Sequence, residues 1–418
     1  MLLSLPLANR EGVPTPYIAA IFTATSAVCV TGLVVVDTYT YWSPFGQAVI
    51  LGLIQVGGLG FMTASTFLFL LLGRRVTLTE RLLLRASHGV SPLGGVINLT
   101  RQVVRVTLVI EGIGAAILAA RLAVDYDLPR ALWMGVFHSV SAFNNAGFDL
   151  FGKFRSLTIY NRDPIILLTI AFLIILGGIS FTVLLNVSQQ QRYRYLLLDT
   201  KLVLLGTGAL LVVGTFGLLL FENGNPNTMG PLDLPAKALN AFFSAVTPRT
   251  AGYNSIDVGK MTEAGLFLTV ALMYIGAAAG STGGGIKVNT FAALAAVVLA
   301  GARGREKVTA FGNEIPPSEI NRALTVALMA LGLVFVVTMV LTLTEPFRLL
   351  QVLFEATSAF GTVGLSTGIT PHLSLAGKLI IIGTMYIGRV GPLTMALALA
   401  QRTRPQHASF PPAQLKIG

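Results

Sequence analysis

The sequence predicts an all-α polytopic membrane protein, built from four consecutive units that surround one central pore. Composition is the first observation, since 54% of the 418 residues are hydrophobic and 11% are charged, whereas soluble domains carry about 25% charged residues. Several apolar stretches are also long enough to cross the ~30 Å hydrocarbon core of a bilayer. Finally, four segments of the chain align with one another without a gap, which is typical of a repeat architecture.

Seven apolar segments are expected to lie in the membrane, at 45–72, 103–124, 164–187, 202–221, 264–300, 323–344 and 377–400. Sixteen of the twenty-nine Lys and Arg residues, but only five acidic residues, fall on one side of them, in 73–105, 188–201, 302–322 and 401–418. The positive-inside rule assigns this side to the cytoplasm. We therefore expect a multi-pass protein of the inner (cytoplasmic) cell membrane. Its basic residues near the spans contact membrane lipid, and no nucleic acid is expected as a partner.

The four aligned segments each place a phenylalanine ten residues before a glycine. They read FTATSAVCVTG (22–32), FHSVSAFNNAG (137–147), FFSAVTPRTAG (242–252) and FEATSAFGTVG (354–364). A serine shares one position in three of them, as Ser26, Ser141 and Ser358, where the third segment has Val246. A second motif, whose first glycine comes 24 to 30 residues later, follows each segment as VGGLGFMT, LGGISFTV, IGAAAGSTGGG and IGRVGPLT.

Each unit is therefore expected to contain an outer helix, a half-helix of about ten residues, an extended stretch that bears the glycine, and a second helix. Irregular backbone at membrane depth must be buried in protein or line water, so four such stretches around one axis make a pore. The glycine permits the positive φ that can turn a carbonyl inward. The units are expected at 1–72, 73–187, 188–300 and 301–400, with a cytoplasmic tail at 401–418. The first unit has only MLLSLPL where an outer helix is needed, so we expect this helix to be truncated and the natural start to lie upstream of Met1.

These motifs resemble the Trk/Ktr/HKT superfamily of potassium transporters, and most closely its Ktr-type membrane subunit. The likeness covers nearly the whole chain and rests on CVTGL, NNAGF, TPRTAGY, GTVGLSTG, GSTGGGIK and YIGRVGPLT. It implies that the four extended stretches form one selectivity filter that binds potassium ions. The filter residues carried over are Val30, Thr31, Gly32, Asn145, Ala146, Gly147, Thr250, Ala251, Gly252, Thr362, Val363 and Gly364. All four glycines are present, which favours potassium over the sodium-preferring branch that has serine in the first position.

The stretch GAAAGSTGGGIK at 276–287 differs from a phosphate-binding loop, because Ile286 separates Gly285 from Lys287 and apolar sequence surrounds it. The resemblance implies instead an intramembrane loop that lies under the filter and gates the pore. Its gate residues are Gly276, Ala277, Ala278, Ala279, Gly280, Ser281, Thr282, Gly283, Gly284, Gly285 and Lys287, together with Arg389. A close helix-packing stretch of small residues is the alternative, but five glycines in ten residues would weaken a continuous helix.

Several ionisable residues have alternative interpretations. Arg389 takes a position held by glycine in the first two units, so it either repels cations in a closed pore or pairs with a carboxylate. Glu355 is either a hydrogen-bond partner between helices or part of the cation's electrostatic surroundings. Asp37 and Asp149 follow filter stretches and either attract cations at the mouth or are solvated loop acids.

We expect a transporter rather than an enzyme, because the acids deep in the spans, Glu111 and Glu355, have no plausible nucleophile or metal cluster with them. His138 alone makes no metal site, so potassium at the filter is the expected metal. A proton- or sodium-coupled cation symporter is the alternative function, although inverted repeats would then be expected. The resemblance also implies a homodimer and a cytoplasmic ring of RCK-type nucleotide-binding regulatory subunits. It leaves open whether the sodium ion acts as an activator.

Overall fold

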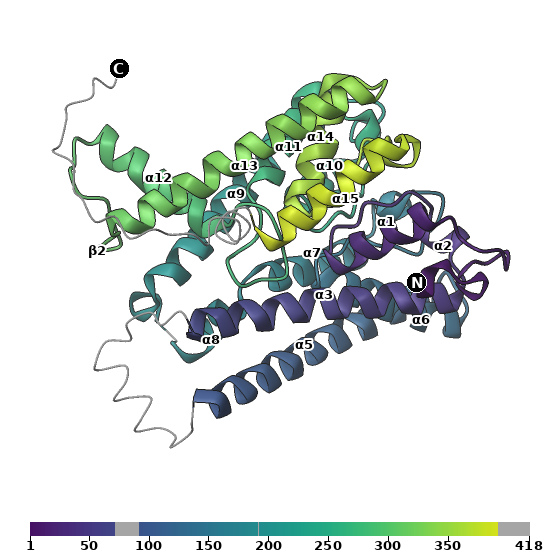
Figure 1. Ribbon diagram of the computed structural model, residues 1–418, viewed down its shortest axis with the longest axis horizontal. Helices are drawn as coiled ribbons and strands as arrows, with labels where there is room; N and C mark the ends of the chain where they lie inside the picture. Colours follow the sequence, from purple (N-terminus) through teal and green to yellow (C-terminus); the bar gives the residue numbers. More distant parts are fainter. Residues whose placement is uncertain (72–91, 191, 392–418) are drawn as a thin grey trace, which may run out of the picture.

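The computed structural model describes residues 1–71, 92–190 and 192–391, with the side chains of 61–71 and 92–99 left outside that description. Within these ranges the chain is mostly helical. The strands found there are β1 (Thr309–Ala310) and β2 (Asn313–Glu314), which pair as an antiparallel hairpin. Helices from distant parts of the sequence pack side by side (Figure 1). The predicted helical class is confirmed, while the expected tail 401–418 lies outside the described residues.

The longest helices are α3 (Pro44–Leu71), α5 (Pro92–Leu122), α9 (Leu198–Glu222) and α13 (Pro317–Thr344). By length and composition, three helical segments of the described chain can cross a membrane, namely Thr100–Leu122, Leu198–Glu222 and Pro317–Thr344. The bent pair α7 (Pro164–Gly178) and α8 (Phe181–Gln189) adds a fourth if it is counted as one span. Several apolar helices of this length are typical of a multi-pass membrane protein.

One expected span, 164–187, is not a straight helix, because α7 and α8 meet at 94°. The Gly178 carbonyl accepts a hydrogen bond from the Ala278 N–H at 3.0 Å. The Gly177 carbonyl accepts one from Thr282 Oγ1 at 2.9 Å. The last carbonyls of a helix lack partners within it, and here a distant loop supplies the donors. Apolar sequence continues across the bend, so hydropathy alone predicted one span.

Four shorter helices each lead into one of the aligned glycine-bearing stretches: α1 (Tyr17–Val28), α6 (Leu128–Phe143), α10 (Leu234–Val246) and α14 (Leu349–Gly361). They contain 12, 16, 13 and 13 residues. At ~1.5 Å per residue this is about 18–24 Å, which is too short to cross the bilayer. Proline in the first turn of α6 and α10 fixes where these helices begin.

The helices that follow are α7, α11 (Glu263–Tyr274), α12 (Val288–Ala302) and α15 (Leu375–Val390). The expected span 264–300 is interrupted between α11 and α12, over residues 275–287. The end of the expected span 377–400 lies outside the described residues. The remaining elements are short and lie in loops: η1 (Leu2–Ser4), η2 (Pro6–Ala8), α2 (Thr38–Tyr41), η3 (Ser156–Tyr160), η4 (Tyr193–Tyr195), η5 (Val258–Lys260) and η6 (Thr370–His372).

Buried carboxylates connect the ends of two long helices to the starts of later helices. Glu222 at the end of α9 accepts hydrogen bonds from the Thr262 N–H at 2.8 Å and the Thr262 hydroxyl at 2.7 Å. Glu345 at the end of α13 accepts the same pair of bonds from Ser374, at 3.0 Å and 2.5 Å. Thr262 and Ser374 are themselves the N-caps of α11 and α15. Each carboxylate therefore fixes the entry of a helix that leads to the centre of the molecule.

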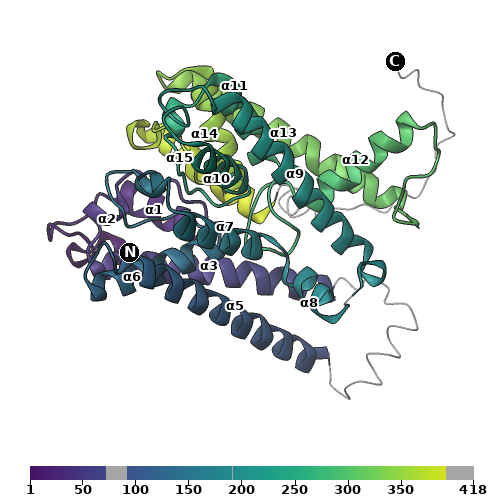
Figure 2. The same cartoon turned by 180° about the vertical axis from the view of Figure 1, so that it is seen from behind.

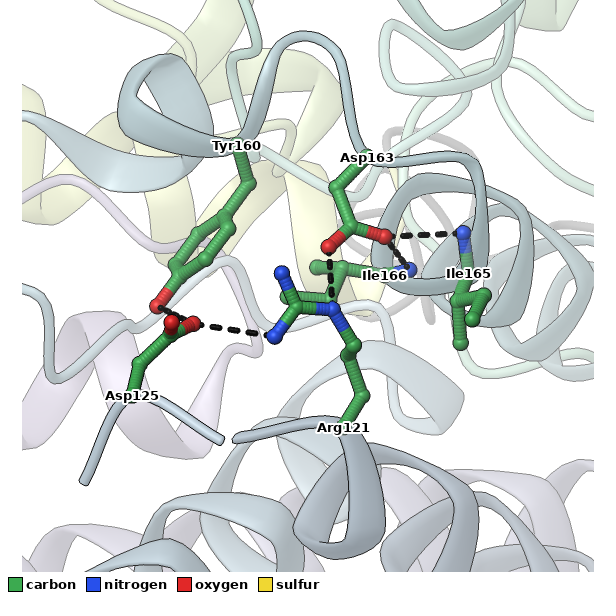
Figure 3. A network of polar contacts seen from close by, with 6 residues as sticks. All are labelled: Arg121, Asp125, Tyr160, Asp163, Ile165 and Ile166. Atoms are coloured by element: carbon green, nitrogen blue, oxygen red, sulfur yellow. Dashed lines mark hydrogen bonds and ion pairs between the residues drawn. The ribbon is translucent and has the colours of Figure 1, made fainter. Parts of the chain in front are cut away.

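The start of α7 is held by an ion-pair network instead (Figure 3). Arg121, on the last turn of α5, lies 2.6 Å from Asp163 and 3.0 Å from Asp125. Asp163 caps α7 by accepting the N–H groups of Ile165 and Ile166, and Tyr160 donates its hydroxyl to Asp125 at 3.1 Å. Arg121 thus joins the end of α5 to the start of α7, as Glu222 and Glu345 join the ends of α9 and α13 to the starts of later helices.

The helix ends are sorted between two sides of the molecule (Figures 1 and 2). The start of α5, the α8–α9 junction and the hairpin between α12 and α13 lie at one end in both views, while α2 and the start of α6 lie at the other. The described parts of the basic loops at 92–105, 188–201 and 302–322 therefore share one end.

Candidate ion pathway

The four aligned glycines form a closed ring, here called the glycine ring (Gly32, Gly147, Gly252 and Gly364). A Cβ atom added at Gly32 would lie 2.5 Å from the Ala146 carbonyl oxygen and 3.1 Å from Cα of Gly147. The same relation joins Gly147 to the Ala251 carbonyl at 2.7 Å, and Gly252 to the Val363 carbonyl at 2.5 Å. Gly364 closes the circle against the Thr31 carbonyl. Each glycine thus touches the residue that precedes the next glycine, and no side chain fits between them.

The backbone repeats its conformation at all four positions. The ring glycines have φ angles of 94°, 70°, 76° and 93°. Two residues before each glycine stands a non-glycine residue with positive φ: Val30 at 55°, Asn145 at 57°, Thr250 at 73° and Thr362 at 48°. Positive φ is costly for β-branched residues, and such strain gathers where a ligand or mechanism requires it. All twelve residues assigned to the filter from the sequence therefore lie in four equivalent stretches.

A hydroxyl group near the end of the preceding short helix holds each of the four stretches, and in three of them it belongs to the serine of the aligned position. Ser26 accepts the Gly32 N–H at 3.0 Å, and Ser358 accepts the Gly364 N–H at 3.1 Å. Ser141 donates to the Phe148 carbonyl at 2.8 Å. In the third segment Val246 occupies the serine position, and the next residue, Thr247, donates to the Tyr253 carbonyl at 2.6 Å. The alignment missed Thr247 because its hydroxyl is displaced by one residue along the helix.

A second tie lies nine residues before the glycine in two of the segments. Fully buried Glu355 accepts hydrogen bonds from Ser366 Oγ at 2.9 Å and from the Thr370 hydroxyl. At the equivalent position, His138 Nε2 accepts the Leu150 N–H at 3.1 Å. Both side chains thus join a short helix to the loop that follows its glycine. Glu355 is therefore a hydrogen-bond partner of the segment after its glycine, including Thr370 at the start of η6. Its part in the cation's electrostatic surroundings stays a prediction.

A cavity of about 310 Å³ lies on one side of the glycine ring and is bordered by all four of its members. Asp37, Asp149 and Asp257 also line it. Asp37 has a structural role, since its carboxylate accepts hydrogen bonds from the N–H groups of Thr40 and Phe154, each at 2.7 Å. Burial raises the pKa of the Asp149 carboxyl to about 7, and the nearby charge of Asp37 adds to this shift. The raised pKa means that the Asp149 carboxyl binds a proton more readily than a free aspartate does.

The second glycine motif seats the short helices. A Cβ atom at Gly57, Gly177 or Gly388 would collide with the backbone carbonyl at the end of a short helix, at Val28, Phe143 and Phe360 respectively. The equivalent residue of the third unit, Gly276, faces the Gly284 carbonyl instead. Among the described residues, the third unit is thus the one in which the glycine contacts the carbonyl of a loop instead of a carbonyl at the end of a short helix.

That loop, 275–287, lies on the side of the ring opposite the cavity. A Cβ atom at Gly283 would collide with the Thr250 hydroxyl, and one at Gly284 with the Thr362 hydroxyl. Thr250 and Thr362 each precede a ring glycine by two residues, whereas the cavity is lined by residues that follow the glycines. The loop is closed at its base by the Gly276 N–H, which donates to the Ile286 carbonyl at 2.7 Å.

Two cations near the loop, partly buried Lys287 and buried Arg389, bind backbone carbonyls. Lys287 Nζ donates to the carbonyls of Gly283 and Gly284. Arg389 donates from Nη1 to the Thr282 carbonyl and from Nη2 to the Gly57 carbonyl, the latter at 2.7 Å. Arg389 therefore bridges α15, the loop and α3, and the carbonyl oxygens disperse its charge. The loop and Arg389 thus lie together on the side of the four stretches that faces away from the cavity.

Comparison with known proteins gives consistent results. A family model described as TrkH, cation transport protein, matches residues 2–410. The chain is 43% identical over 418 residues to Ktr system potassium uptake protein B of Bacillus subtilis, spanning 100% of this chain and 93% of that protein. It is 40% identical to potassium/sodium uptake protein NtpJ of Enterococcus hirae, spanning 98% and 91% of the two chains. The crystal structure of the potassium transporter TrkH from Vibrio parahaemolyticus has a similar fold, with a TM-score of 0.72 at 18% identity over 93% of this chain and 79% of that one.

Proposed function

Because this chain belongs to the TrkH family of cation transport proteins, which are transporters rather than enzymes, we propose that it carries out potassium-selective uptake through the glycine ring. The observation that carries the proposal is the closed contact of four equivalent stretches, each with the same backbone conformation. Two relatives named for potassium or potassium/sodium uptake, each at least 40% identical, support the choice of ion.

In the proposed mechanism, backbone carbonyls of the twelve filter residues replace the water around a potassium ion. A ring of carbonyls can do this without bearing a formal charge, so the ion is held firmly enough to enter and weakly enough to leave. The short helices α1, α6, α10 and α14 end just before the filter stretches. Their C-terminal ends carry partial negative charge and would favour a cation there. Four units of helix, short helix, filter stretch and second helix would surround this single pore, with boundaries at 72, 187, 300 and 400.

We assign gating to the loop 275–287 and to Arg389. The support is positional, since Gly283 and Gly284 pack against two filter threonines and Arg389 bonds to the loop at Thr282. In this position the loop would occlude the passage below the filter. Small residues let it change path at little steric cost.

The proposed setting is the inner cell membrane, with the basic helix ends in the cytoplasm. Two curated relatives are named as parts of a Ktr system, which fits a membrane protein that works with a separate regulatory subunit. We propose a homodimer bound by a cytoplasmic RCK-type nucleotide-binding ring, with sodium as either a second transported ion or an activator.

Growth and flux measurements test the function. A strain that lacks its own potassium uptake should grow at low potassium when it expresses this chain, because the protein supplies the missing pathway. In proteoliposomes, the purified protein should carry potassium faster than sodium, and this flux should need no imposed proton or sodium gradient. Flux that depends on a proton or sodium gradient would favour the symporter. Absence of potassium flux from folded protein with its regulatory subunit would refute the proposal.

Arg389→Ala is expected to raise the potassium flux by about tenfold or more, because it removes both a cation near the passage and the bond that holds the loop at Thr282. Losing one hydrogen bond to a charged group shifts a two-state equilibrium by about 1.5–3 kcal/mol. The flux should be measured in proteoliposomes at matched protein density. Arg389→Lys should retain part of the barrier. If Arg389→Ala fails to insert into the membrane, the residue is a structural tie rather than a gate.

A further inference from the structure

A buried polar cluster lies behind the second filter stretch, formed by Gln55 of α3, Glu111 of α5 and Asn144 at the end of α6. Glu111 Oε2 accepts a hydrogen bond from Gln55 Nε2 at 3.1 Å, and Oε1 accepts one from Asn144 Nδ2 at 2.9 Å. Asn144 Nδ2 also lies 3.0 Å from Gln55 Oε1. The cluster therefore joins three separate helices through one carboxyl group.

The cluster is buried, and the burial of its carboxyl group is energetically unfavourable. Asn144 is fully buried, and Glu111 is 4% exposed, although Glu111 lies within a helix apolar enough to cross a membrane. Burying a carboxyl at such a depth is unfavourable unless its oxygens are satisfied. Here each oxygen accepts a bond from an amide N–H. An apolar residue would pack at lower cost, so the carboxyl needs an explanation other than stability.

The cluster connects directly to the filter. Asn144 is the C-cap of α6, and the next residue, Asn145, has the strained φ of 57°. Asn145 Nδ2 in turn donates to the Arg249 carbonyl at 3.1 Å and to the Thr250 hydroxyl at 3.2 Å. A continuous path thus runs from Glu111 through two adjacent asparagines to the third filter stretch.

Helix α3 makes room for this arrangement. A Cβ atom at Gly58 would lie 2.7 Å from Cγ of Asn144, so the asparagine fits only because the helix has glycine there. The adjacent Gly57 carbonyl accepts the bond from Arg389 at 2.7 Å. Two consecutive glycines of α3 therefore contact the polar cluster and the proposed gate.

We propose that Glu111 is a positioning residue for ion selectivity. It holds Asn144, and through Asn144 the backbone of Asn145, so that the second filter stretch keeps its distance from the other three. This inference rests on the proposed function of the glycine ring. Glu111 does not touch the ion in this role. Its two hydrogen bonds fix the end of α6 against α3 and α5.

Selectivity measurements on matched variants test this role. Glu111→Leu should lower the ratio of potassium to sodium flux in proteoliposomes by about fivefold, which is the change expected when one hydrogen bond separates two arrangements. Asn144→Ala should lower it by a similar factor, and the double variant by no more than either alone, because both act through one contact. Glu111→Gln keeps the side-chain shape and one acceptor oxygen but turns an NH2 group toward one of the two amide donors, so its flux ratio should lie between those of Glu111→Leu and the original protein.

Glu345→Leu is the matched control. It removes another buried carboxylate that accepts two hydrogen bonds, but at the end of α13, where the partner is Ser374. We expect it to lower thermal stability and leave the flux ratio unchanged. If Glu111→Leu does not fold, Asn144→Ala and Gln55→Leu decide the question by the same ratio.

An unchanged ratio in folded Glu111→Leu or Asn144→Ala would overturn the inference, as would an equal fall in Glu345→Leu. These outcomes leave the proposed function standing, provided the unmodified protein still selects potassium. If the unmodified protein shows no such preference, the proposed function fails first.

Discussion

Gly32→Ser is expected to cut potassium flux and to raise sodium relative to potassium, by about tenfold in the flux ratio. A side chain at Gly32 meets two obstacles: the backbone has a φ of 94°, and its Cβ would lie 2.5 Å from the Ala146 carbonyl oxygen. Backbone strain of this kind costs about 1–3 kcal/mol, and the added volume pushes the first stretch away from the second. A widened ring suits a dehydrated ion less well, and its serine hydroxyl offers sodium another ligand.

Gly12→Ser is the control for backbone strain alone. Gly12 also has a positive φ, of 71°, but no atom lies within 4 Å of an added Cβ, and it does not line the cavity beside the glycine ring. We expect it to fold less stably and to keep the selectivity of the unmodified protein. Competitive flux of potassium and sodium in proteoliposomes measures both variants. An unchanged ion preference in folded Gly32→Ser would show that the glycine ring is not the filter.

Deletion of residues 277–284 is expected to raise the maximum rate of potassium uptake, on the order of tenfold if about 1.4 kcal/mol favours the closed loop. The deletion can be joined cleanly, because a Cβ atom at Gly285 would lie 3.8 Å from Cα of Gly276. The two ends are thus already neighbours. Removing the intervening residues takes Gly283 and Gly284 away from Thr250 and Thr362, which opens the passage below the filter.

Two readouts separate this gate from other roles of the loop. The ratio of potassium to sodium flux should barely change, because the ring glycines and their supporting hydroxyls remain. Dependence on the cytoplasmic partner should weaken, since there is less loop to move. If the purified chain bound ATP without a partner, Lys287→Ala abolished this binding and the deletion left uptake unchanged, the gate assignment would be wrong.

The four equivalent stretches could be predicted from the sequence because the four segments align without gaps, so each position has three equivalents for comparison. Their role as a filter was implied by the family resemblance and stays a prediction. Contacts between the units could not be assigned in this way. Arg389 donates a hydrogen bond to the Gly57 carbonyl across 332 positions of the chain, and no local sequence pattern predicts such a pair. Sequence analysis could identify Arg389 as unusual but could not identify its partner.

For the same reason, the sequence did not predict the polar cluster or the bend in the α7–α8 segment. Glu111 could be recognised as an acid deep in a span, but Asn144 lies 33 residues away and Gln55 lies 56 residues away. The bend at Gly178 depends on donors from the loop beyond α11. The donors at the bend and Gln55 come from other units, whereas Asn144 is a distant residue of the same unit as Glu111. Hydropathy reports only how apolar a segment is, so it cannot predict either kind of partner.

The contact between Gly364 and the Thr31 carbonyl also has a consequence for biosynthesis. In a channel assembled from four identical subunits, the circle closes when separate chains meet. Here the glycine ring closes within one polypeptide, between a residue that is translated early and one that is translated late. The ring therefore cannot be completed until the last quarter of the protein has been translated and inserted. It also means that one codon alters one quadrant of the circle, and each quadrant can diverge separately in the course of evolution.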